Sequence, residues 1–386
     1  MKRVLMLASV ASMIDQFNIP NIELLISMGY QVDVACNFIN GNTCSPIVIN
    51  ELKNKLNKMN VQCFQIDFAR DIMKLGDNIK AISQVKNILK KHRYEFIHCH
   101  SPIGGVAGRL VGLFTRTKVI YTAHGFHFFK GAPKKNWLIY YPIEWVCSWL
   151  TDILITINIE DFEFAHTHLH AKKVYYTPGI GIDVKRFGKR EEKKSIRSQK
   201  REELGILDAD ILLLSVGELN ENKNHIVVIK SLAKLKNKHI HYILCGVGEL
   251  NEQYVKLIQE LGLEDRVHLL GFRNDVSELC TAADIFVFPS YREGLSVALM
   301  EAMASGLPVV ASKIRGNTDL LENSSKKYLV NPDSVDAITK AIQNLVTHKR
   351  QRYKIGDMNY QYIRKFDIEV VQGKMRDIYM TISDTH

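Results

Sequence analysis

Short apolar runs alternate with amphipathic segments along almost the whole 386-residue chain. The run RVLMLAS (3–9) is continuous, as expected for a strand that is buried on both faces of a sheet. The segment IKAISQVKNILKKHR (79–93) instead repeats its apolar residues every three or four positions, which indicates an amphipathic helix. The other predicted strands are QVDVAC (31–36), FIHCHS (96–101), KVIYTAHG (118–125), DILITIN (152–158), ILLLSVG (211–217), HYILCGVG (241–248), VHLLGF (267–272), DIFVFPS (284–290) and LPVVAS (307–312).

Strands that alternate with helices predict an α/β fold, with a parallel sheet covered by helices on both faces. The pattern breaks at the mixed-charge run KRFGKREEKKSIRSQKREE (185–203) and then starts again. We therefore predict two doubly wound, Rossmann-like domains that face each other across a cleft, with ligands at the carboxyl ends of the strands. The predicted parts are an N-terminal domain (1–184), an exposed charged interdomain segment (185–204), a C-terminal domain (205–355) and C-terminal helices that cross back to the first domain (356–386).

The composition is typical of a soluble globular protein, with 46% hydrophobic and 24% charged residues. No apolar run reaches the roughly 18–20 residues that a membrane-spanning helix needs. The apolar run at the start stops at Asp15, so we interpret it as a buried strand rather than a signal peptide. The seven cysteines are scattered and form no CxxC pair, which predicts reduced thiols and a cytoplasmic location.

The formal net charge of the chain is +10. No helix-turn-helix and no aromatic-plus-basic RNA signature accompanies this charge, so we predict no nucleic-acid partner. An anionic membrane surface or a phosphate-bearing substrate would each suit a basic protein of this kind.

Two carboxylates flank the start of a predicted helix in SYREGLSVALMEAMASGLPVV (290–310). Ser296 is the predicted N-cap of this helix, and Gly306 is its expected C-terminal stop. Glu293 then lies in the loop before the helix, while Glu301 lies in its second turn.

The N-terminus of this helix predicts a phosphate site, because its free N–H groups point outward. Those groups belong to Gly294, Leu295 and Ser296. Carboxylates repel phosphate, so Glu293 and Glu301 make chemical sense as acceptors for hydroxyl groups on the two sides of a diphosphate. A nucleotide sugar has that layout. On spacing alone, the alternative stays open that Glu293 is a loop charge and Glu301 an exposed helix residue.

The segment PSYREGLSVALMEAMASGLPVVAS (289–312) resembles the family 4 glycosyltransferases, which are retaining enzymes of the GT-B fold. Their signature holds two glutamates, with seven residues between them, inside EGxxxxxxEAMAxGxPVVAS. Segments 97–110, 121–128, 177–187 and 246–290 are also similar to that family, so the resemblance covers nearly the whole chain. It is closest to the members that build capsules, exopolysaccharides and other glycans on lipid carriers.

The resemblance implies a role for particular residues. Glu293 would contact the donor sugar near its 3-hydroxyl and the reacting centre, and Glu301 would bind the ribose. Lys223 would stabilise the negative charge that develops on the departing diphosphate, as a fixed cation does. The other implied donor-binding positions are Gly217, Glu218, Phe272, Arg273 and the backbone of Gly294, Leu295 and Ser296.

The sequence departs from the family at Glu218, where many relatives carry an arginine that completes the diphosphate clamp. A carboxylate that pointed the same way would repel the diphosphate. Either Arg292 or Arg273 supplies the missing cation, or the site is inactive. A further alternative is that Glu218 turns away and pairs with Lys223.

In the N-terminal, acceptor-side domain, His124 matches the family's histidine near the anomeric region of the donor. It would position and polarise a sugar hydroxyl there. His127 is expected on the acceptor side, with a structural histidine at a strand end as the alternative. The family's glycine pair after the first strand is replaced by SMIDQFN (12–18), in which Asp15 and Gln16 are candidates for hydrogen bonds to the acceptor.

No metal and no cofactor is predicted besides the nucleotide-sugar substrate. The clusters HCH (98–100), HGFH (124–127) and HTHLH (166–170) lack the spacing of recognised metal sites. In HYILCGVGEL (241–250) only a GxG follows the strand, and Asn251 stands where the third glycine of a dinucleotide fingerprint belongs. A nicotinamide dehydrogenase, a sugar-nucleotide epimerase and a non-catalytic nucleotide-sugar sensor stay open as alternatives.

The resemblance implies a retaining hexosyl- or N-acetylhexosaminyltransferase whose donor is UDP-linked rather than GDP-linked. The expected acceptor is a growing glycan on a polyprenyl diphosphate carrier, in capsule or exopolysaccharide biosynthesis. No side chain stands out as a covalent nucleophile, so we favour front-face attack, in which the diphosphate helps deprotonate the incoming hydroxyl. We expect the enzyme to act in the cytoplasm as a peripheral protein on the inner face of the cell membrane.

The segment FFKGAPKKNWLIYYPIEWVCSWL (128–150) combines aromatic residues with lysines, which suits a membrane interface. The aromatic residues that recur at every fourth position are Trp137, Tyr141, Trp145 and Trp149. The lysines just before them are Lys130, Lys134 and Lys135. We predict that this segment contacts an anionic membrane, with the loop at its start on the membrane and the later tryptophans buried. The alternative is that the whole aromatic face packs into the N-terminal domain.

Overall fold

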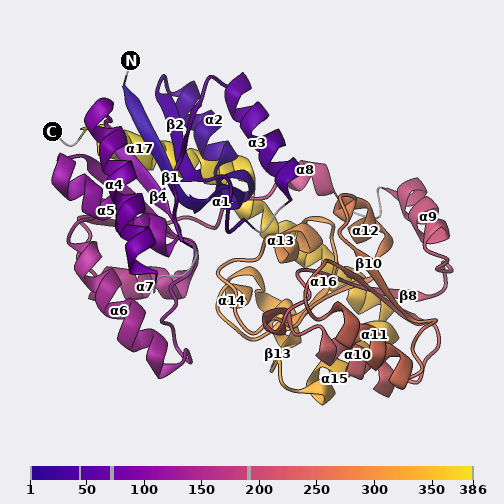
Figure 1. The fold of residues 1–386 in the computed structure, drawn as a ribbon. Helices are drawn as coiled ribbons and strands as arrows, with labels where there is room; N and C mark the ends of the chain where they lie inside the picture. The colour runs from indigo at the N-terminus through magenta and orange to yellow at the C-terminus, as the bar shows by residue number, and fades with distance from the viewer. Residues whose placement is uncertain (1, 43–44, 70–73, 189–192, 385–386) are drawn as a thin grey trace. The chain divides into compact units, whose positions relative to one another are not determined.

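Two parallel sheets organise the chain, each with helices on both faces (Figure 1). The computed structural model describes residues 2–42, 45–69, 74–188 and 193–384. One unit consists of residues 1–181 together with 369–386, and the other consists of residues 182–368. This architecture confirms the predicted pair of doubly wound α/β domains.

The first unit contains a seven-stranded sheet in the order β3-β2-β1-β4-β5-β6-β7. Its strands are β1 (Arg3–Val10), β2 (Gln31–Asn37), β3 (Gln62–Gln65), β4 (Phe96–His100), β5 (Lys118–Ala123), β6 (Ile153–Thr156) and β7 (Lys173–Tyr176). Its helices are α1 (Ala11–Phe17), α2 (Ile19–Ser27), α3 (Pro46–Lys58), α4 (Leu75–Lys91), α5 (Pro102–Thr115), α6 (Lys134–Ser148), α7 (Ile159–His168) and α17 (Ile368–Asp384).

The side chains of the central strand β1 alternate between two apolar layers, because successive strand residues point to opposite faces. Val4 and Met6 pack in the layer that includes α2, α3 and α17, while Leu5 and Leu7 pack in the layer that includes α4 and α5. Burial on both faces explains why the run 3–9 is continuously apolar.

The second unit contains a six-stranded sheet in the order β10-β9-β8-β11-β12-β13. Its strands are β8 (Ile211–Val216), β9 (Ile240–Cys245), β10 (Val267–Gly271), β11 (Ile285–Phe288), β12 (Val309–Ser312) and β13 (Leu329–Val330). Its α-helices are α8 (Val184–Phe187), α9 (Lys194–Glu203), α10 (Ile226–Lys234), α11 (Asn251–Glu260), α12 (Val276–Ala282), α13 (Val297–Ala304), α14 (Asn317–Leu320), α15 (Val335–Thr347) and α16 (Lys349–Ile363). Short 3-10 helices are η2 (Glu221–Lys223), η3 (Asn323–Tyr328) and η4 (Arg364–Phe366).

Most described residues of the charged run at 185–203 are exposed, as predicted, but the run is largely helical rather than a linker; residues 189–192 lie outside the described part. Residues 194–203 form α9, which packs against α12. The side chain of Lys200 is 9% exposed because its ammonium lies within 2.8 Å of the carboxylates of Glu203, Asp275 and Glu278. Arg201 is buried against Asp284 at 3.2 Å. Partners far along the chain therefore bury charges that a local pattern assigns to solvent.

The division between the units also differs from the predicted bounds of 184 and 355. Helix α16 stays with the second unit, and α17 alone returns to the first (Figure 1, yellow). The return is driven by apolar burial, because one face of α17 enters the layer beneath β1 and β4. The buried residues of this face are Val371, Met375, Ile378, Tyr379 and Ile382.

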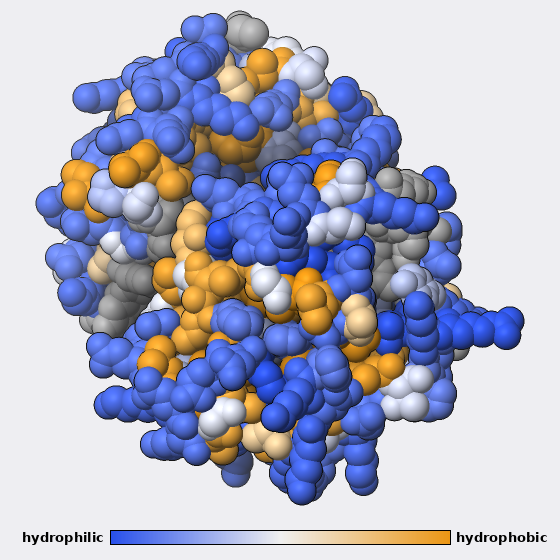
Figure 2. Space-filling model, turned by 90° about the vertical axis from the view of Figure 1, so that its right-hand side faces the viewer, coloured by the Kyte–Doolittle hydropathy of each residue, from blue (hydrophilic) through white to orange (hydrophobic). Residues whose placement is uncertain are grey.

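Hydrophilic residues cover most of the molecular face in Figure 2, and hydrophobic residues form smaller groups between them. Among the described helices, none combines the length and the apolar character that crossing a bilayer would require.

Candidate active site

The predicted phosphate-binding helix is present as α13, between strands β11 and β12. The Ser296 hydroxyl caps it by accepting a hydrogen bond from the backbone N–H of Leu299 at 3.3 Å. Gly306 follows its end with φ of 72°, a conformation that favours glycine. The loop that holds Glu293 thus leads directly into a capped helix N-terminus, where the first N–H groups have no partner within the helix and suit an anion.

Lys223 and Glu293 are brought together although 70 residues separate them. The Lys223 ammonium donates to the Glu293 carboxylate at 2.7 Å, and it also lies 5.1 Å from the centre of the Phe288 ring. Backbone contacts align the two loops: the N–H of Tyr291 donates to the carbonyl of Asn222 at 2.8 Å. The pair is partly open to solvent, with 20% of the lysine and 12% of the glutamate side chain exposed.

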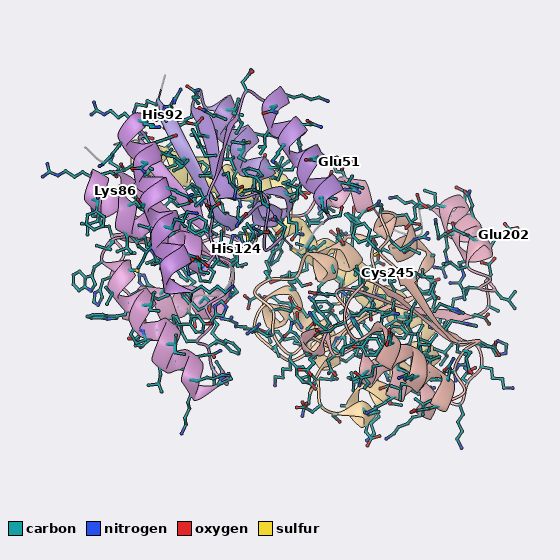
Figure 3. All side chains as sticks on the ribbon, in the orientation of Figure 1. Glu51, Lys86, His92, His124, Glu202 and Cys245 are labelled. Atoms are coloured by element: carbon teal, nitrogen blue, oxygen red, sulfur yellow. The ribbon has the colours of Figure 1, made fainter. Side chains whose placement is uncertain are left out.

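The glycines of the GxG motif, Gly246 and Gly248, allow close packing against the loop that precedes Lys223. A Cβ atom on Gly246 would lie 1.8 Å from the carbonyl oxygen of Gly217, and one on Gly248 would lie 2.4 Å from that of Leu219. Strand β9 ends at Cys245, labelled in Figure 3. The missing side chains therefore allow close packing against the loop before Lys223, which accounts for the motif without a dinucleotide.

Glu218 is exposed and does not pair with Lys223, so that alternative is wrong. Arg273 is engaged elsewhere: its guanidinium donates to both oxygens of Asp275 and contacts Glu203 at 3.0 Å. These bonds raise the pKa of Arg273 above its usual range. Arg292 is exposed beside Glu293 and, among the described residues, its guanidinium has no ion pair. Of the two proposed substitutes, Arg292 is the one left available to a diphosphate.

Glu301 is half-buried on α13, which excludes the alternative of an exposed helix residue. Burial raises the pKa of its carboxyl group to about 7, and the charge of Arg186 opposes that shift. Burial deprives the ionised carboxylate of full solvation. A hydrogen-bond donor on a ligand would therefore stabilise it. Phe272 is 71% exposed on the loop after β10.

We expect nucleotide affinity to depend on the ionisation of Glu301. Only the ionised carboxylate accepts two ribose hydroxyls, so the affinity for UDP should rise by about tenfold between pH 6 and pH 8 in the parent protein. The control is Glu301→Gln, whose side chain does not ionise. Any pH dependence of its affinity comes from the titration of UDP itself. Calorimetric titration at several pH values measures both. Identical pH dependence in the two proteins would show that Glu301 does not bind the ligand.

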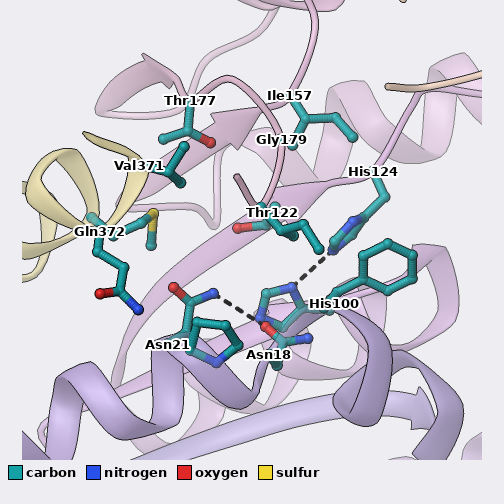
Figure 4. A pocket seen from close by; sticks show the side chains of 14 residues that line it. Asn18, Asn21, His100, Thr122, His124, Ile157, Thr177, Gly179, Val371 and Gln372 are labelled. Carbon is teal, nitrogen blue, oxygen red and sulfur yellow. Dashed lines mark hydrogen bonds between the residues drawn. The ribbon is translucent and has the colours of Figure 1, made fainter. Parts of the chain in front are cut away.

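A hollow in the first unit lies beside His124, at the carboxyl ends of β4 and β5 (Figure 4). Its polar side chains include those of Asn18, Asn21, His100, Thr122, His124 and Gln372. No charged residue is among the described residues that line it. Such a set of neutral donors and acceptors matches the hydroxyl groups of an uncharged sugar.

The predicted acceptor-side residues are not among the side chains that line this hollow. Asp15 is half-buried near Lys55 and Glu51 of α3, and burial raises the pKa of its carboxyl group. Gln16 is exposed. His127 instead stacks on Tyr140 of α6, with ring centres 4.6 Å apart.

Residues next to the predicted ones line the hollow instead. Asn18 is the last residue of the run 12–18 and the N-cap of α2, and Asn21 lies three residues further on; within that run we had singled out Asp15 and Gln16 instead. His100 shares a strand face with His98, a two-residue spacing that was visible in HCH. Gln372 comes from α17, for which no local signal exists. In the part of the chain that the structure describes, no three His, Cys, Asp or Glu side chains are grouped to hold a metal ion.

Comparison with known proteins matches most of the chain to glycosyltransferases. Residues 196–362 match the family model "Glycosyl transferases group 1", and residues 3–158 match "Glycosyl transferase 4-like". The protein EpsD of Bacillus subtilis (strain 168) is 33% identical over 99% of this chain and 97% of its own. An Escherichia coli protein, UDP-Gal:alpha-D-GlcNAc-diphosphoundecaprenol alpha-1,3-galactosyltransferase, is 27% identical over 81% of each chain.

Solved structures share the fold. Anabaena HepE, in complex with UDP and glucose, superposes with a TM-score of 0.79 at 20% identity, over 99% of this chain and 100% of its own. WaaG, a glycosyltransferase involved in lipopolysaccharide biosynthesis, superposes with a TM-score of 0.71 at 19% identity, over 97% of this chain and 99% of its own.

Proposed function

Because the chain belongs to the group 1 glycosyltransferases, we propose that it transfers a sugar with retention of configuration from a UDP-sugar to a lipid-linked glycan acceptor. Its activity as a glycosyltransferase follows from the family. The observation that carries the finer proposal is the Lys223–Glu293 pair, set at 2.7 Å beside the capped N-terminus of α13. A fixed cation, a carboxylate and free N–H groups are the parts that departure of a nucleoside diphosphate needs.

The chemistry assigned to each part follows from its charge. As the bond between the sugar and the diphosphate breaks, negative charge grows on the leaving phosphate oxygens. The Lys223 ammonium and the N–H groups of Gly294 and Leu295 stabilise that charge, which lowers the barrier. The Glu293 carboxylate accepts a hydrogen bond from a donor-sugar hydroxyl and stabilises the positive charge that develops on the ring. A phosphate oxygen then takes the proton of the attacking hydroxyl on the same face.

Known relatives support the choice of donor and acceptor. The Escherichia coli relative is named for UDP-Gal and for a diphosphoundecaprenol-linked acceptor, and HepE was solved with UDP and glucose. We propose the same classes here, a hexose or N-acetylhexosamine donor and an exopolysaccharide or capsule intermediate on a polyprenyl carrier. Lys223 supplies a fixed charge for the diphosphate, so we propose that transfer needs no metal ion.

A panel of nucleotide sugars tests the donor class. UDP-sugars should raise the unfolding temperature of the protein, because a ligand of the native state stabilises it by mass action. GDP-sugars and nicotinamide dinucleotides should have no effect. UDP release that depends on an added acceptor identifies a transferase. Isomerised donor would instead identify an epimerase, and binding without turnover a sensor.

The surface of α6 supports a location of the protein at the membrane, but the tryptophans that it exposes differ from the ones that we expected. Trp137 packs against Phe128 and Phe164 in the core, while Trp145 and Trp149 are 40% and 60% exposed. This reverses our expectation that the later tryptophans are buried. Each four-residue step turns about 40° around a helix, so three steps carry the series about 120° away from the core-facing side.

The exposed face of α6 is apolar along its length. Its exposed apolar residues are Leu138, Ile139, Trp145 and Val146, followed by Trp149 at its C-cap. The lysines at its start, Lys134 and Lys135, are exposed, as is Lys130 in the preceding loop. We propose that this face lies on the inner, anionic surface of the cell membrane, where indole rings insert at headgroup depth and lysines meet phosphates.

Serine at both Trp145 and Trp149 should weaken binding to anionic vesicles by about tenfold, because two interfacial rings are lost. Vesicle sedimentation measures this. Leu207→Ser is the matched control, since Leu207 is 66% exposed but belongs to the second unit.

Changing Lys130, Lys134 and Lys135 to glutamate should remove the salt-dependent part of vesicle binding. Turnover of a soluble acceptor should be unaffected in all these variants; vesicle binding equal to that of the parent would refute the membrane surface.

A further inference from the structure

Two buried histidines interrupt the apolar layer on one face of the first sheet. His98 and His100 lie two residues apart on β4, so both point toward the layer that α17 and α2 cover. Both are essentially inaccessible to solvent. Their ring centres are 4.2 Å apart, yet each has its own partners.

His98 belongs to a structural set. Its Nδ1 lies 2.9 Å from the hydroxyl of Tyr379 on α17, and its Nε2 lies 2.8 Å from the hydroxyl of Thr122 on β5. Hydroxyl groups both donate and accept, so these partners suit either tautomer of His98.

His100 is more constrained, because one of its partners can only accept. Its Nε2 lies 3.2 Å from the sulfur of Met6, and its Nδ1 lies 3.1 Å from Nε2 of His124 (Figure 4). A thioether carries no hydrogen, so Nε2 of His100 must hold the proton; otherwise two lone pairs would face each other. Nδ1 of His100 is then a lone-pair acceptor, and Nε2 of His124 must donate to it.

Each of the three imidazole rings is neutral near neutral pH, with a proton on one of its two nitrogens. Burial lowers the pKa of His98 to about 3 and that of His124 to about 4, and it lowers the pKa of His100 well below its usual value. A neutral imidazole has one N–H and one lone pair. The proton on Nε2 of His124 therefore leaves Nδ1 of that ring as its acceptor.

We infer that His100 is a positioning residue that fixes His124 as the Nε2-protonated tautomer, so that Nδ1 of His124 accepts a hydrogen bond from a hydroxyl group of the sugar substrate. His124 is partly exposed and lines the hollow described above, and among the described residues nothing bonds to its Nδ1. The assignment of the ligand as a sugar rests on the proposed function. The tautomer itself does not, because it follows from Met6, His100 and His124 alone.

Nitrogen NMR of the full chain with labelled histidines tests the tautomer directly. His124→Gln assigns the ring signals by their loss. In the parent protein, Nδ1 of His124 should resonate as an unprotonated nitrogen and Nε2 as a protonated one. In His100→Gln, whose amide can either donate or accept, the His124 signals should change to those of mixed tautomers. Met6→Leu, which keeps the volume but removes the sulfur, should produce part of the same change.

His98→Gln is the matched control, because it alters a ring on the same strand and face with equal burial but no bond to His124. Its His124 signals should be those of the parent. Protonated Nδ1 in the parent, or a parental tautomer in His100→Gln, would overturn the inference whether or not the protein transfers sugar. If the function is also as proposed, His100→Gln should lower kcat by about tenfold with little change in the KM for donor. An unchanged kcat together with mixed tautomers would overturn the substrate contact.

Discussion

Glu293→Ala is expected to abolish sugar transfer while leaving the protein folded. The carboxylate is the group that we assign to the donor sugar, and within the described part of the chain its hydrogen-bond partner is the Lys223 ammonium at 2.7 Å. It lies in a partly exposed loop, where truncating a side chain costs little packing. Product formation from a UDP-sugar and a lipid-linked acceptor measures the loss, and the unfolding temperature reports the fold.

Glu221→Ala is the control for this experiment, because Glu221 is an exposed carboxylate on η2 close to Lys223 in sequence. It should transfer sugar at the parental rate. UDP binding should survive in both variants, since Glu293 is assigned to the sugar end of the donor. Turnover of Glu293→Ala at the parental rate would remove this residue from the mechanism.

Lys223→Ala should slow transfer by about 100-fold or more, the effect of removing one preorganised group that stabilises developing charge. Its ammonium has a short ion pair and a ring contact, so the charge is already held in place before the substrate arrives. Lys223→Arg should recover part of the rate, because the charge is kept while its geometry changes. Single-turnover kinetics isolate the chemical step.

Lys230→Ala provides the comparison, since Lys230 is an exposed lysine on α10 in the same unit. It should not change the rate. Combining Lys223→Ala with Glu293→Ala should cost little more than Glu293→Ala alone, because residues that act as a unit are not additive. A loss of less than tenfold in Lys223→Ala would contradict its assignment to the leaving group.

Features governed by neighbouring residues could be predicted from the sequence. The helix α13 has its cap at Ser296 and its stop at Gly306, and both signals act within a few residues. The strands could be predicted for the same reason, since their continuous apolar runs reflect burial on both faces. The family resemblance added that Lys223 and Glu293 belong to one site, which spacing alone did not reveal.

Features governed by distant partners could not be predicted. The charges of α9 look solvated until Asp275 and Asp284 approach them from other segments. From the sequence, the tryptophans at 137, 145 and 149 were expected on one helix face. Each four-residue step turns about 40° around the axis, so Trp137 and Trp149 point in directions about 120° apart. Gln372 enters the hollow beside His124 only because the end of the chain returns to the first unit.

That return has a consequence for synthesis of the protein on the ribosome. The seven described strands of the first unit are translated before the second unit, but the residues of α17 that help fill the layer beneath them are translated after it. Until then, apolar side chains of β1 and β4 lack part of their cover, while the whole of the second unit is already available to fold. The first unit is thus completed only after the second unit has been translated. A premature stop near residue 368 would leave a finished second unit attached to an N-terminal unit with an open apolar face, a species prone to aggregation.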